Sequence, residues 1–237
     1  MAEQSARPAY YAREGGRAAD WWTLLHPPYT VWHLSYVVLG ACVAVDVDLG
    51  VLGLTVAAFL LAMGVGAHAL DELQGRPLGT SIGDRTLWAA AVVSVLAAVG
   101  IGVWMALEQT PWLWPLVVLG PVLVAGYNLE LFGGRLHTDL GFAASWGGFA
   151  ALTGYVAQGP PWEAAGVVGI VLVTVAATLL SLAQRRLSTP ARRLRRHSPD
   201  VDPDVRAGAL VPLEGALRAM AWAHPLLALG LLAGRVG

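Results

Sequence analysis

The chain contains no lysine, only one cysteine and few charged residues, and each shortage excludes a class of protein. All 15 lysine-plus-arginine positions are arginine, so no amine is present to form the Schiff base of a seven-helix retinal protein. Cys42 has no second cysteine with which to form a disulfide within the chain. Charged residues make up 13% of the sequence, whereas a soluble domain typically carries about 25%. This composition disfavours an ordinary soluble domain.

Long apolar runs take the place of the missing charge. Hydrophobic residues make up 56% of the chain, and its mean hydropathy is +0.59. A helix needs about 20 mostly apolar residues to cross a bilayer, and the runs show no period-two alternation of the kind that barrel strands have. We therefore expect an all-α, polytopic membrane helix bundle with about seven transmembrane helices. The expected spans are 30–47, 49–69, 87–107, 112–130, 140–158, 164–183 and 211–233.

The arginines predict the orientation of the bundle. They occur in the N-terminal tail and in the loops that follow the second, fourth and sixth spans, whereas the intervening loops 46–48, 108–111 and 158–163 contain none. Because cytoplasmic loops are enriched in basic residues, we expect a multi-pass cell-membrane protein with a cytoplasmic N terminus. Residues 1–20 are polar and predict a disordered or interfacial cytosolic tail, and residues 21–237 predict a single transmembrane domain in contact with membrane lipids. No nucleic-acid partner is expected.

The first polar cluster follows the second span. His68, Asp71 and Glu72 have helical i, i+3, i+4 spacing, which puts them on one face if the helix continues. An imidazole and two carboxylates suit a divalent ion, and oxygen-rich sets suit Mg²⁺, which commonly takes further oxygens from a phosphate. The alternative is an ordinary helix end in water, with the carboxylates paired to Arg76.

The second cluster follows the fourth span. Tyr127 and Glu130 share a helix face beside Asn128, and a Gly-Gly pair then ends the helix before Arg135. Glu130 is a candidate second acidic group facing the first cluster, and Arg135 is a candidate for bidentate hydrogen bonds to a phosphate. The alternative is a loop with local helix caps.

The third cluster follows the sixth span, where Gln184 and Arg185 lie nearest the membrane and are the candidates for ligand contact. The remaining arginines of this stretch fit a positive-inside signal. In the fifth span, Trp146, Phe149 and Tyr155 predict either an aromatic wall, which would stabilise a carbocation by cation–π interaction, or simple packing.

Taken together, the clusters resemble the UbiA superfamily of intramembrane prenyltransferases. Residues 24–41, LLHPPYTVWHLSYVVLGA, resemble that family's first helix, and polar clusters after the second, fourth and sixth spans resemble its layout. Of the family's first motif, Asn-Asp-x-x-Asp-x-x-x-Asp, only Asp71 matches outright. The second Asp-rich motif is absent, since Gln184 and Arg185 stand where its acids would be, and the family commonly has nine spans.

The resemblance implies an enzyme that acts on an isoprenyl diphosphate, with Mg²⁺ assisting the loss of diphosphate. The isoprenyl group is then either transferred to a lipophilic acceptor or cyclised to a terpene. The resemblance also implies metal binding by Asp71, Glu72, Glu130 and His68. The expected catalytic residues are Asp71, Glu72, Glu130 and Tyr127. The expected substrate contacts are His68, Arg76, Asn128, Arg135, Gln184, Arg185, Trp146 and Tyr155.

Two other interpretations stay open. His68, Glu72, Glu130, His137 and Asp139 are a mixed nitrogen and oxygen set of the kind that a non-haem iron oxidase or hydroxylase uses. The absence of the second acidic motif instead favours a non-catalytic protein that binds isoprenoids or lipids.

Overall fold

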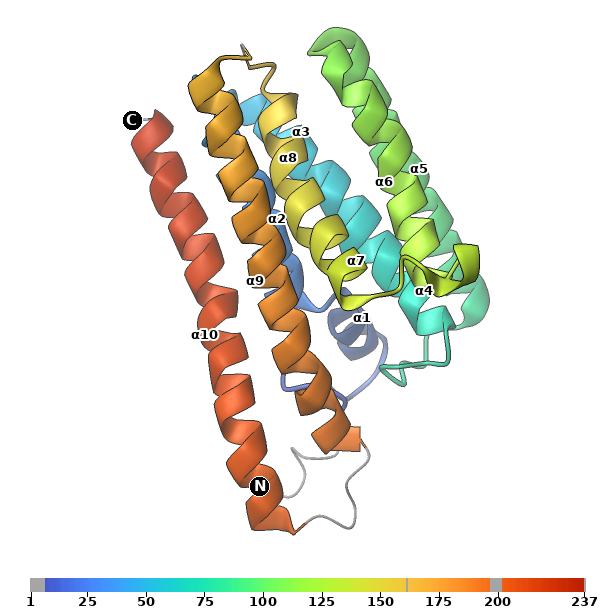
Figure 1. The fold of residues 1–237 in the computed structure, drawn as a ribbon. Coiled ribbons are helices and arrows are strands. Elements are labelled where there is room, and N and C mark those ends of the chain that lie inside the picture. Colours follow the sequence, from blue (N-terminus) through green and yellow to red (C-terminus); the bar gives the residue numbers. More distant parts are fainter. Residues whose placement is uncertain (1–6, 161, 197–201, 237) are drawn as a thin grey trace.

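The computed structural model describes residues 7–160, 162–196 and 202–236, and these residues form helices joined by loops, with no strand among them (Figure 1). The elements are α1 (Arg17–Leu25), α2 (Pro27–Ala41), α3 (Leu49–Phe59), η2 (Leu60–Ala67), α4 (His68–Leu73), α5 (Asp84–Glu108), η3 (Pro111–Leu113), α6 (Trp114–Asn128), η4 (Phe132–Gly134), α7 (Asp139–Ala143), η5 (Ala144–Gly148), α8 (Phe149–Ala157), α9 (Ala164–Arg196) and α10 (Pro203–Val236). The elements α3, η2 and α4 form one continuous rod, and so do α7, η5 and α8; η2 and η5 are π-helical turns within them. The prediction of an all-α fold is confirmed.

Within the described ranges, five helical rods are long and apolar enough to cross a membrane. They are Leu49–Leu73, Asp84–Glu108, Pro111–Asn128, Ala164–Arg195 and Asp204–Val236. The expected first span, 30–47, differs, because α2 has 15 residues and ends at Ala41. The rod 139–157 is also outside this set. Both are the most enclosed parts of the bundle, with Trp32, Tyr36 and Ala151 fully buried, so protein rather than lipid surrounds much of their surface.

The centre of the bundle is the close contact between α2 and α8. Gly40 of α2 lies against the backbone of Ala151, and Gly154 of α8 lies against the backbone of Val37. A Cβ atom at either glycine would overlap the facing carbonyl oxygen. Gly40 on α2 and the small pair Ala151 and Gly154 on α8 therefore let the two backbones touch, which is a common way for helices to associate in membranes.

We expect Gly154→Val to destabilise the protein by about 3 kcal/mol or more, because α2 and α8 must separate to accept the side chain. Gly40→Val acts on the same contact and should have a similar effect. Gly100→Ala is the matched control, since a Cβ at this glycine of α5 meets nothing within 4 Å. Unfolding in detergent measures the three variants, and equal stability of Gly154→Val and Gly100→Ala would contradict the packing.

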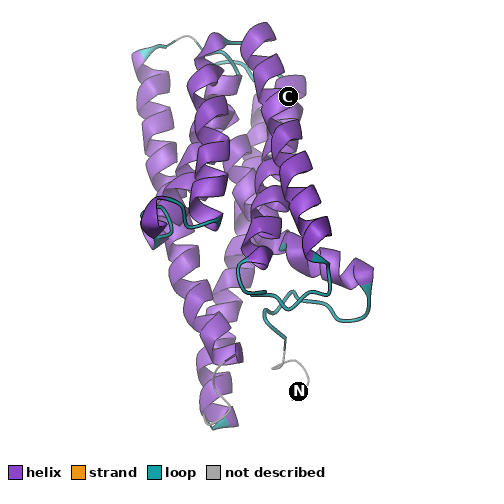
Figure 2. Ribbon diagram, turned by 90° about the vertical axis from the view of Figure 1, so that its right-hand side faces the viewer, coloured by secondary structure: helices purple, strands orange, loops and turns teal. Residues whose placement is uncertain are grey.

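One end of the bundle gathers the N-terminal segment 7–16, the loops 74–83 and 129–138, the last turns of α9 and the first turns of α10; we call it the arginine-rich end (lower end in Figure 1). With 33 and 34 residues, α9 and α10 are about 50 Å long at 1.5 Å per residue. Figure 2 shows both helices projecting beyond the other helices at this end. There Arg195 and Glu214 join them through a buried ion pair with an Nε–Oε1 distance of 2.5 Å.

The N-terminal segment packs onto the arginine-rich end. Tyr11 is buried and its carbonyl oxygen accepts a hydrogen bond from Nε1 of Trp22 at 3.1 Å. The guanidinium of Arg218 lies 4.8 Å from the ring centroid of Tyr10, and burial raises the pKa of Tyr10 to about 12. Residues 7–20 thus pack against the bundle, and residues 1–6 of the expected disordered or interfacial tail lie outside the described part of the chain.

Candidate functional site

At the arginine-rich end, charged side chains from three helices lie near enough to Tyr127 to act on its hydroxyl group electrostatically. Tyr127 lies in the last turn of α6 and is 4% exposed. Its hydroxyl group is buried and has no hydrogen-bond partner within the described chain. Asp71 of α4, Asp139 of α7 and Arg185 of α9 all act electrostatically on it. The structure therefore brings together three predicted site residues, Asp71, Tyr127 and Arg185, from distant parts of the sequence.

Arg185 is held at this position by α7. Its Nε atom lies 3.2 Å from Oδ1 of Asp139, and its guanidinium carbon lies 5.4 Å from the ring centroid of Phe142. Asp139 is the first residue of α7, which Thr138 caps by accepting a hydrogen bond from the backbone N–H of Gly141 at 2.9 Å. The side chain of Arg185 is 22% exposed, so its remaining N–H groups are accessible to an anionic ligand.

Asp71 and Glu72 are adjacent in sequence but have opposite environments. Glu72 is fully buried, and its Oε2 accepts a hydrogen bond from the backbone N–H of Leu78 at 2.9 Å. Its Oε1 accepts two more from Thr80, from the backbone N–H at 2.8 Å and from the hydroxyl at 2.9 Å. Asp71 is half-buried, and no hydrogen bond or ion pair engages its carboxylate within the described residues. Asp71 is thus available to a ligand, and Glu72 holds the loop 74–83.

Arg76 also stabilises the loop 74–83. It adopts a left-handed backbone conformation with φ of 55°. Its guanidinium donates hydrogen bonds to the carbonyl oxygens of Thr80 and Ile82, the latter at 2.5 Å, and pairs with the carboxylate of Asp84. The side chain expected to contact diphosphate is therefore already engaged by its own loop.

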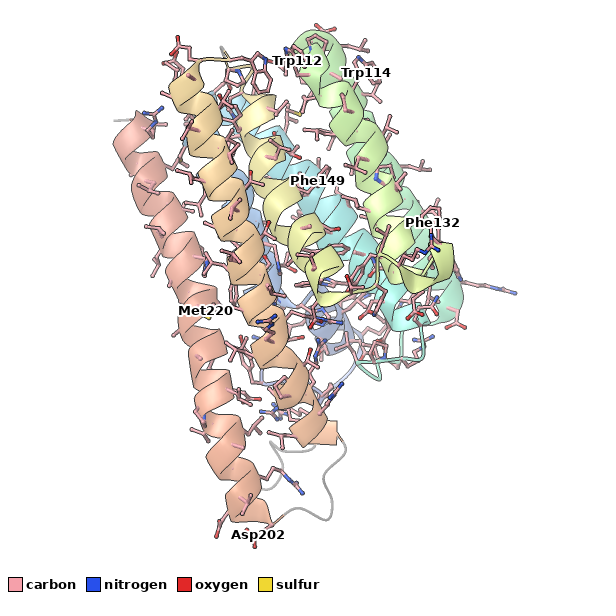
Figure 3. All side chains as sticks on the ribbon, viewed as in Figure 1. Trp112, Trp114, Phe132, Phe149, Asp202 and Met220 are labelled. Carbon is pink, nitrogen blue, oxygen red and sulfur yellow. The ribbon has the colours of Figure 1, made fainter. Side chains whose placement is uncertain are left out.

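An apolar cleft runs along the bundle, and one of its lining residues, Trp146, is in ring contact with Tyr127. It lies between α3–η2, α5, α6 and η5–α8, is open along part of its length, and has a cavity volume of about 110 Å³. Figure 3 shows Phe149 pointing into the space between α8 and α6. Trp146 lines the cleft, and its ring centroid lies 4.8 Å from that of Tyr127. The cleft thus has an apolar lining, and Trp146 connects its wall to Tyr127.

The other residues predicted around Tyr127 differ in exposure and in what their side chains contact. Glu130 has a positive φ of 51°, its side chain is 61% exposed, and its nearest basic partner is His137, with 3.9 Å between Oε1 and Nδ1. Arg135 is exposed. Asn128 is buried and donates a hydrogen bond to the carbonyl oxygen of Val124 at 2.7 Å within its own helix. Glu130 thus lies largely exposed beside His137, whose ring stacks on that of Tyr127 at 4.5 Å, and its facing of Asp71 stays a prediction.

The predicted aromatic wall is divided. Trp146 and Phe149 line the cleft. Tyr155 is buried in the core at the opposite end of the bundle, with its ring centroid 6.0 Å from that of Trp162. Figure 3 places Trp112, a further neighbour of Trp162 at 5.4 Å, at that end. Tyr155 thus packs far from the charged cluster.

His68 and Gln184 border the cluster on the side of α2. The His68 ring lies 4.3 Å from that of His26, and its Nδ1 lies 3.0 Å from the carbonyl oxygen of Gly64. His68 interacts electrostatically with Asp71 and with His33 of α2. Gln184 is 3% exposed and also neighbours His33.

Two contributions to the site have only weak signals in the sequence. Asp139 and Arg185 form an ion pair although they are 46 positions apart in the sequence. The capping residue Thr138 is the sequence signal that indicates the start of α7. Phe142, which stacks on Trp146 at 5.6 Å, occurs in a run of apolar residues without distinguishing pattern.

The carboxylates available limit the metals that this site can hold. Among the described residues, no group of three or more His, Cys, Asp or Glu side chains is placed to hold a metal ion. The five residues of the iron-oxidase interpretation include Glu72, which the loop engages, and Glu130, which lies on the surface. Mg²⁺, however, is often held by one or two carboxylates together with substrate phosphates, and the unengaged carboxylate of Asp71 fits that arrangement.

Comparisons with protein-family models, with curated proteins and with solved structures found no match to this chain. The UbiA resemblance therefore rests on the motifs quoted above and stays a prediction.

Proposed function

We propose that the protein is a UbiA-like intramembrane enzyme that acts on an isoprenyl diphosphate, and that α2 and the rod 139–157 complete seven membrane crossings. The observation that carries this proposal is the ring contact between Trp146, which lines the apolar cleft, and Tyr127, on which Asp71, Asp139 and Arg185 act electrostatically. An isoprenyl diphosphate has the same division, with a long hydrocarbon chain and a highly charged head. The arginine pattern supports a cytoplasmic position for the head.

Each residue of the cluster has a defined task in this proposal. Arg185 donates hydrogen bonds to the oxygens of the leaving diphosphate, as arginine does in many phosphate sites. The hydroxyl of Tyr127 donates another. When bound, Mg²⁺ would neutralise part of the charge that develops on the diphosphate, and Asp71 would hold it together with phosphate oxygens. Trp146 and Phe149 exclude water from the cleft and stabilise a carbocation through their ring faces.

The direct test is release of pyrophosphate by purified protein with geranyl, farnesyl or geranylgeranyl diphosphate and Mg²⁺. We expect release that depends on Mg²⁺ and stops when the metal is chelated. Binding of the same diphosphates, seen as thermal stabilisation without any turnover, would replace this proposal with a non-catalytic isoprenoid-binding protein, which the absence of an acidic cluster among the described residues favours.

A further inference from the structure

The apolar cleft ends in a buried cluster of side chains at each end. Val124 and Trp146 line its inner end, which is the end nearest Tyr127, and both pack in the cluster that contains Tyr127. Met105 and Leu113 line its outer end, where they belong to a separate cluster and are 2% and 3% exposed. A chain that starts beside Tyr127 and follows the cleft is therefore stopped by Met105 and Leu113.

The helices that line the cleft measure its length. On α6 the lining residues extend from Leu113 to Val124, which is about 16 Å at about 1.5 Å per residue. On α5 they extend from Val95 to Met105, which is about 15 Å. The two helices are joined through the short η3 and run in opposite directions, so both place Met105 and Leu113 at the same end.

The lining leaves an occupant of the cleft few polar partners. It is apolar apart from Thr55, Ser145 and Thr153. The hydroxyl groups of Thr55 and Thr153 donate hydrogen bonds to carbonyl oxygens one turn earlier in their own helices, at 2.8 and 2.7 Å. A hydrocarbon chain fits such a lining, because it needs no hydrogen bond.

The cleft is also narrow. Its cavity volume is about 110 Å³, and a cavity needs at least about 10–15 Å³ for each water-sized group that it holds. About seven to eleven such groups therefore fit along its length, which is enough for one hydrocarbon chain and too few for two chains side by side. The part of the cleft that is open leaves room for the methyl branches of an isoprenyl chain.

The length of the cleft corresponds to three isoprene units. An extended polypeptide advances by about 3.5 Å for the three bonds of each residue, so an extended chain of single bonds advances by about 1.2 Å per bond. Each isoprene unit adds four bonds to the chain, or about 5 Å. A farnesyl group of three units is therefore about 15 Å long, a geranyl group about 5 Å shorter and a geranylgeranyl group about 5 Å longer.

Resting on the proposed function, we infer that the cleft selects the substrate by chain length and that farnesyl diphosphate is the preferred substrate. The diphosphate lies beside Tyr127, and the chain follows the cleft away from Trp146. The third isoprene unit contacts Met105 and Leu113, which are the residues that determine the length limit. A geranylgeranyl chain has one unit more than the outer end admits, and a geranyl chain leaves that end unfilled.

The test compares kcat/KM of pyrophosphate release for geranyl, farnesyl and geranylgeranyl diphosphate, which share one head group and differ in chain length. We expect the value for farnesyl diphosphate to exceed each of the others at least tenfold. Met105→Ala opens the outer end, so it should raise the ratio of the geranylgeranyl to the farnesyl value at least tenfold. Met220→Ala is the matched control, because Met220 lies on α10 and does not line the cleft (Figure 3), and its ratio should not change.

A second variant should shift the preference in the opposite direction. Gly102 lines the cleft about 10 Å from Val95 along α5, where two isoprene units end. A Cβ at Gly102 would lie 2.8 Å from Cγ2 of Val117, which also lines the cleft, so Gly102→Ala narrows it there. The ratio of the geranyl to the farnesyl value should rise at least fivefold. Gly100→Ala is the control, since a Cβ at Gly100 meets nothing within 4 Å.

The outcomes separate the two proposals. Pyrophosphate release with equal kcat/KM for farnesyl and geranylgeranyl diphosphate would mean that the last unit leaves through the open side of the cleft. That result overturns the length limit and leaves the proposed function intact. A preference for one of the other two chains, or equal ratios in Met105→Ala and Met220→Ala, does the same. Absence of release with all three diphosphates overturns both proposals.

Discussion

Glu72→Gln is expected to destabilise the protein by about 3 kcal/mol, although it changes one atom of a side chain. The carboxylate accepts hydrogen bonds from Leu78 N–H, Thr80 N–H and the Thr80 hydroxyl, all without access to solvent. Hydrogen bonds to a charged group contribute about 1.5–3 kcal/mol each. The amide loses the charge and turns an NH₂ group toward at least one backbone donor. Arg76 holds the same loop, so the damage should be confined to residues 74–83.

Two measurements check this result. Detergent unfolding gives the loss of stability, and hydrogen–deuterium exchange should show faster exchange at the amides of Leu78 and Thr80. Glu108→Gln is the control, since Glu108 is an exposed carboxylate at the end of α5. Unchanged exchange at both amides in Glu72→Gln would rule out the structural role and return Glu72 to the candidate metal ligands.

The contrast between Asp71 and Glu72 shows what sequence spacing can and cannot predict about this segment. Helical periodicity assigns both residues to the face of His68. Which of the two becomes enclosed depends on the path of the loop, which returns over Glu72 eight residues later at Thr80. That path is set by the left-handed conformations of Gly75 and Arg76 and by the bonds from Arg76, and none of these has a periodic signal.

Hydropathy likewise predicts some of the membrane spans and not others. The rods that face outward, such as α5 with Val92, Val93 and Leu96 exposed, have long apolar runs and were predicted from them. The enclosed helix α2 carries His33 and Tyr36 and ends early, because burial against protein replaces the need for an apolar surface of full length. Hydropathy therefore identifies the outer helices better than the inner ones.

The π-helical turns η2 and η5 add a further deviation that periodicity misses. Each π turn widens the helix locally and shifts the faces of the residues that follow, relative to a regular 3.6-residue repeat. η2 precedes His68 and Asp71 directly, and η5 contains Trp146. Two segments that supply the candidate site thus leave regular α-helix where they reach it, and the orientation of their side chains could not be derived from α-helical spacing.

The second large effect is expected for Asp71→Asn, which should reduce pyrophosphate release at least 100-fold, equivalent to about 2.7 kcal/mol in the activation free energy. Asp71 is the half-buried carboxylate at the cluster without a hydrogen bond or ion pair among the described residues, so its charge is available to hold Mg²⁺ beside the diphosphate. For the same reason the substitution should leave stability nearly unchanged, in contrast to Glu72→Gln.

Asp46→Asn is the control, because Asp46 is an exposed carboxylate at the opposite end of the bundle. Steady-state rates at several Mg²⁺ concentrations should show that excess metal recovers part of the lost activity. Equal rates for Asp71→Asn and Asp46→Asn, in folded protein, would mean that the charge of Asp71 takes no part in the reaction.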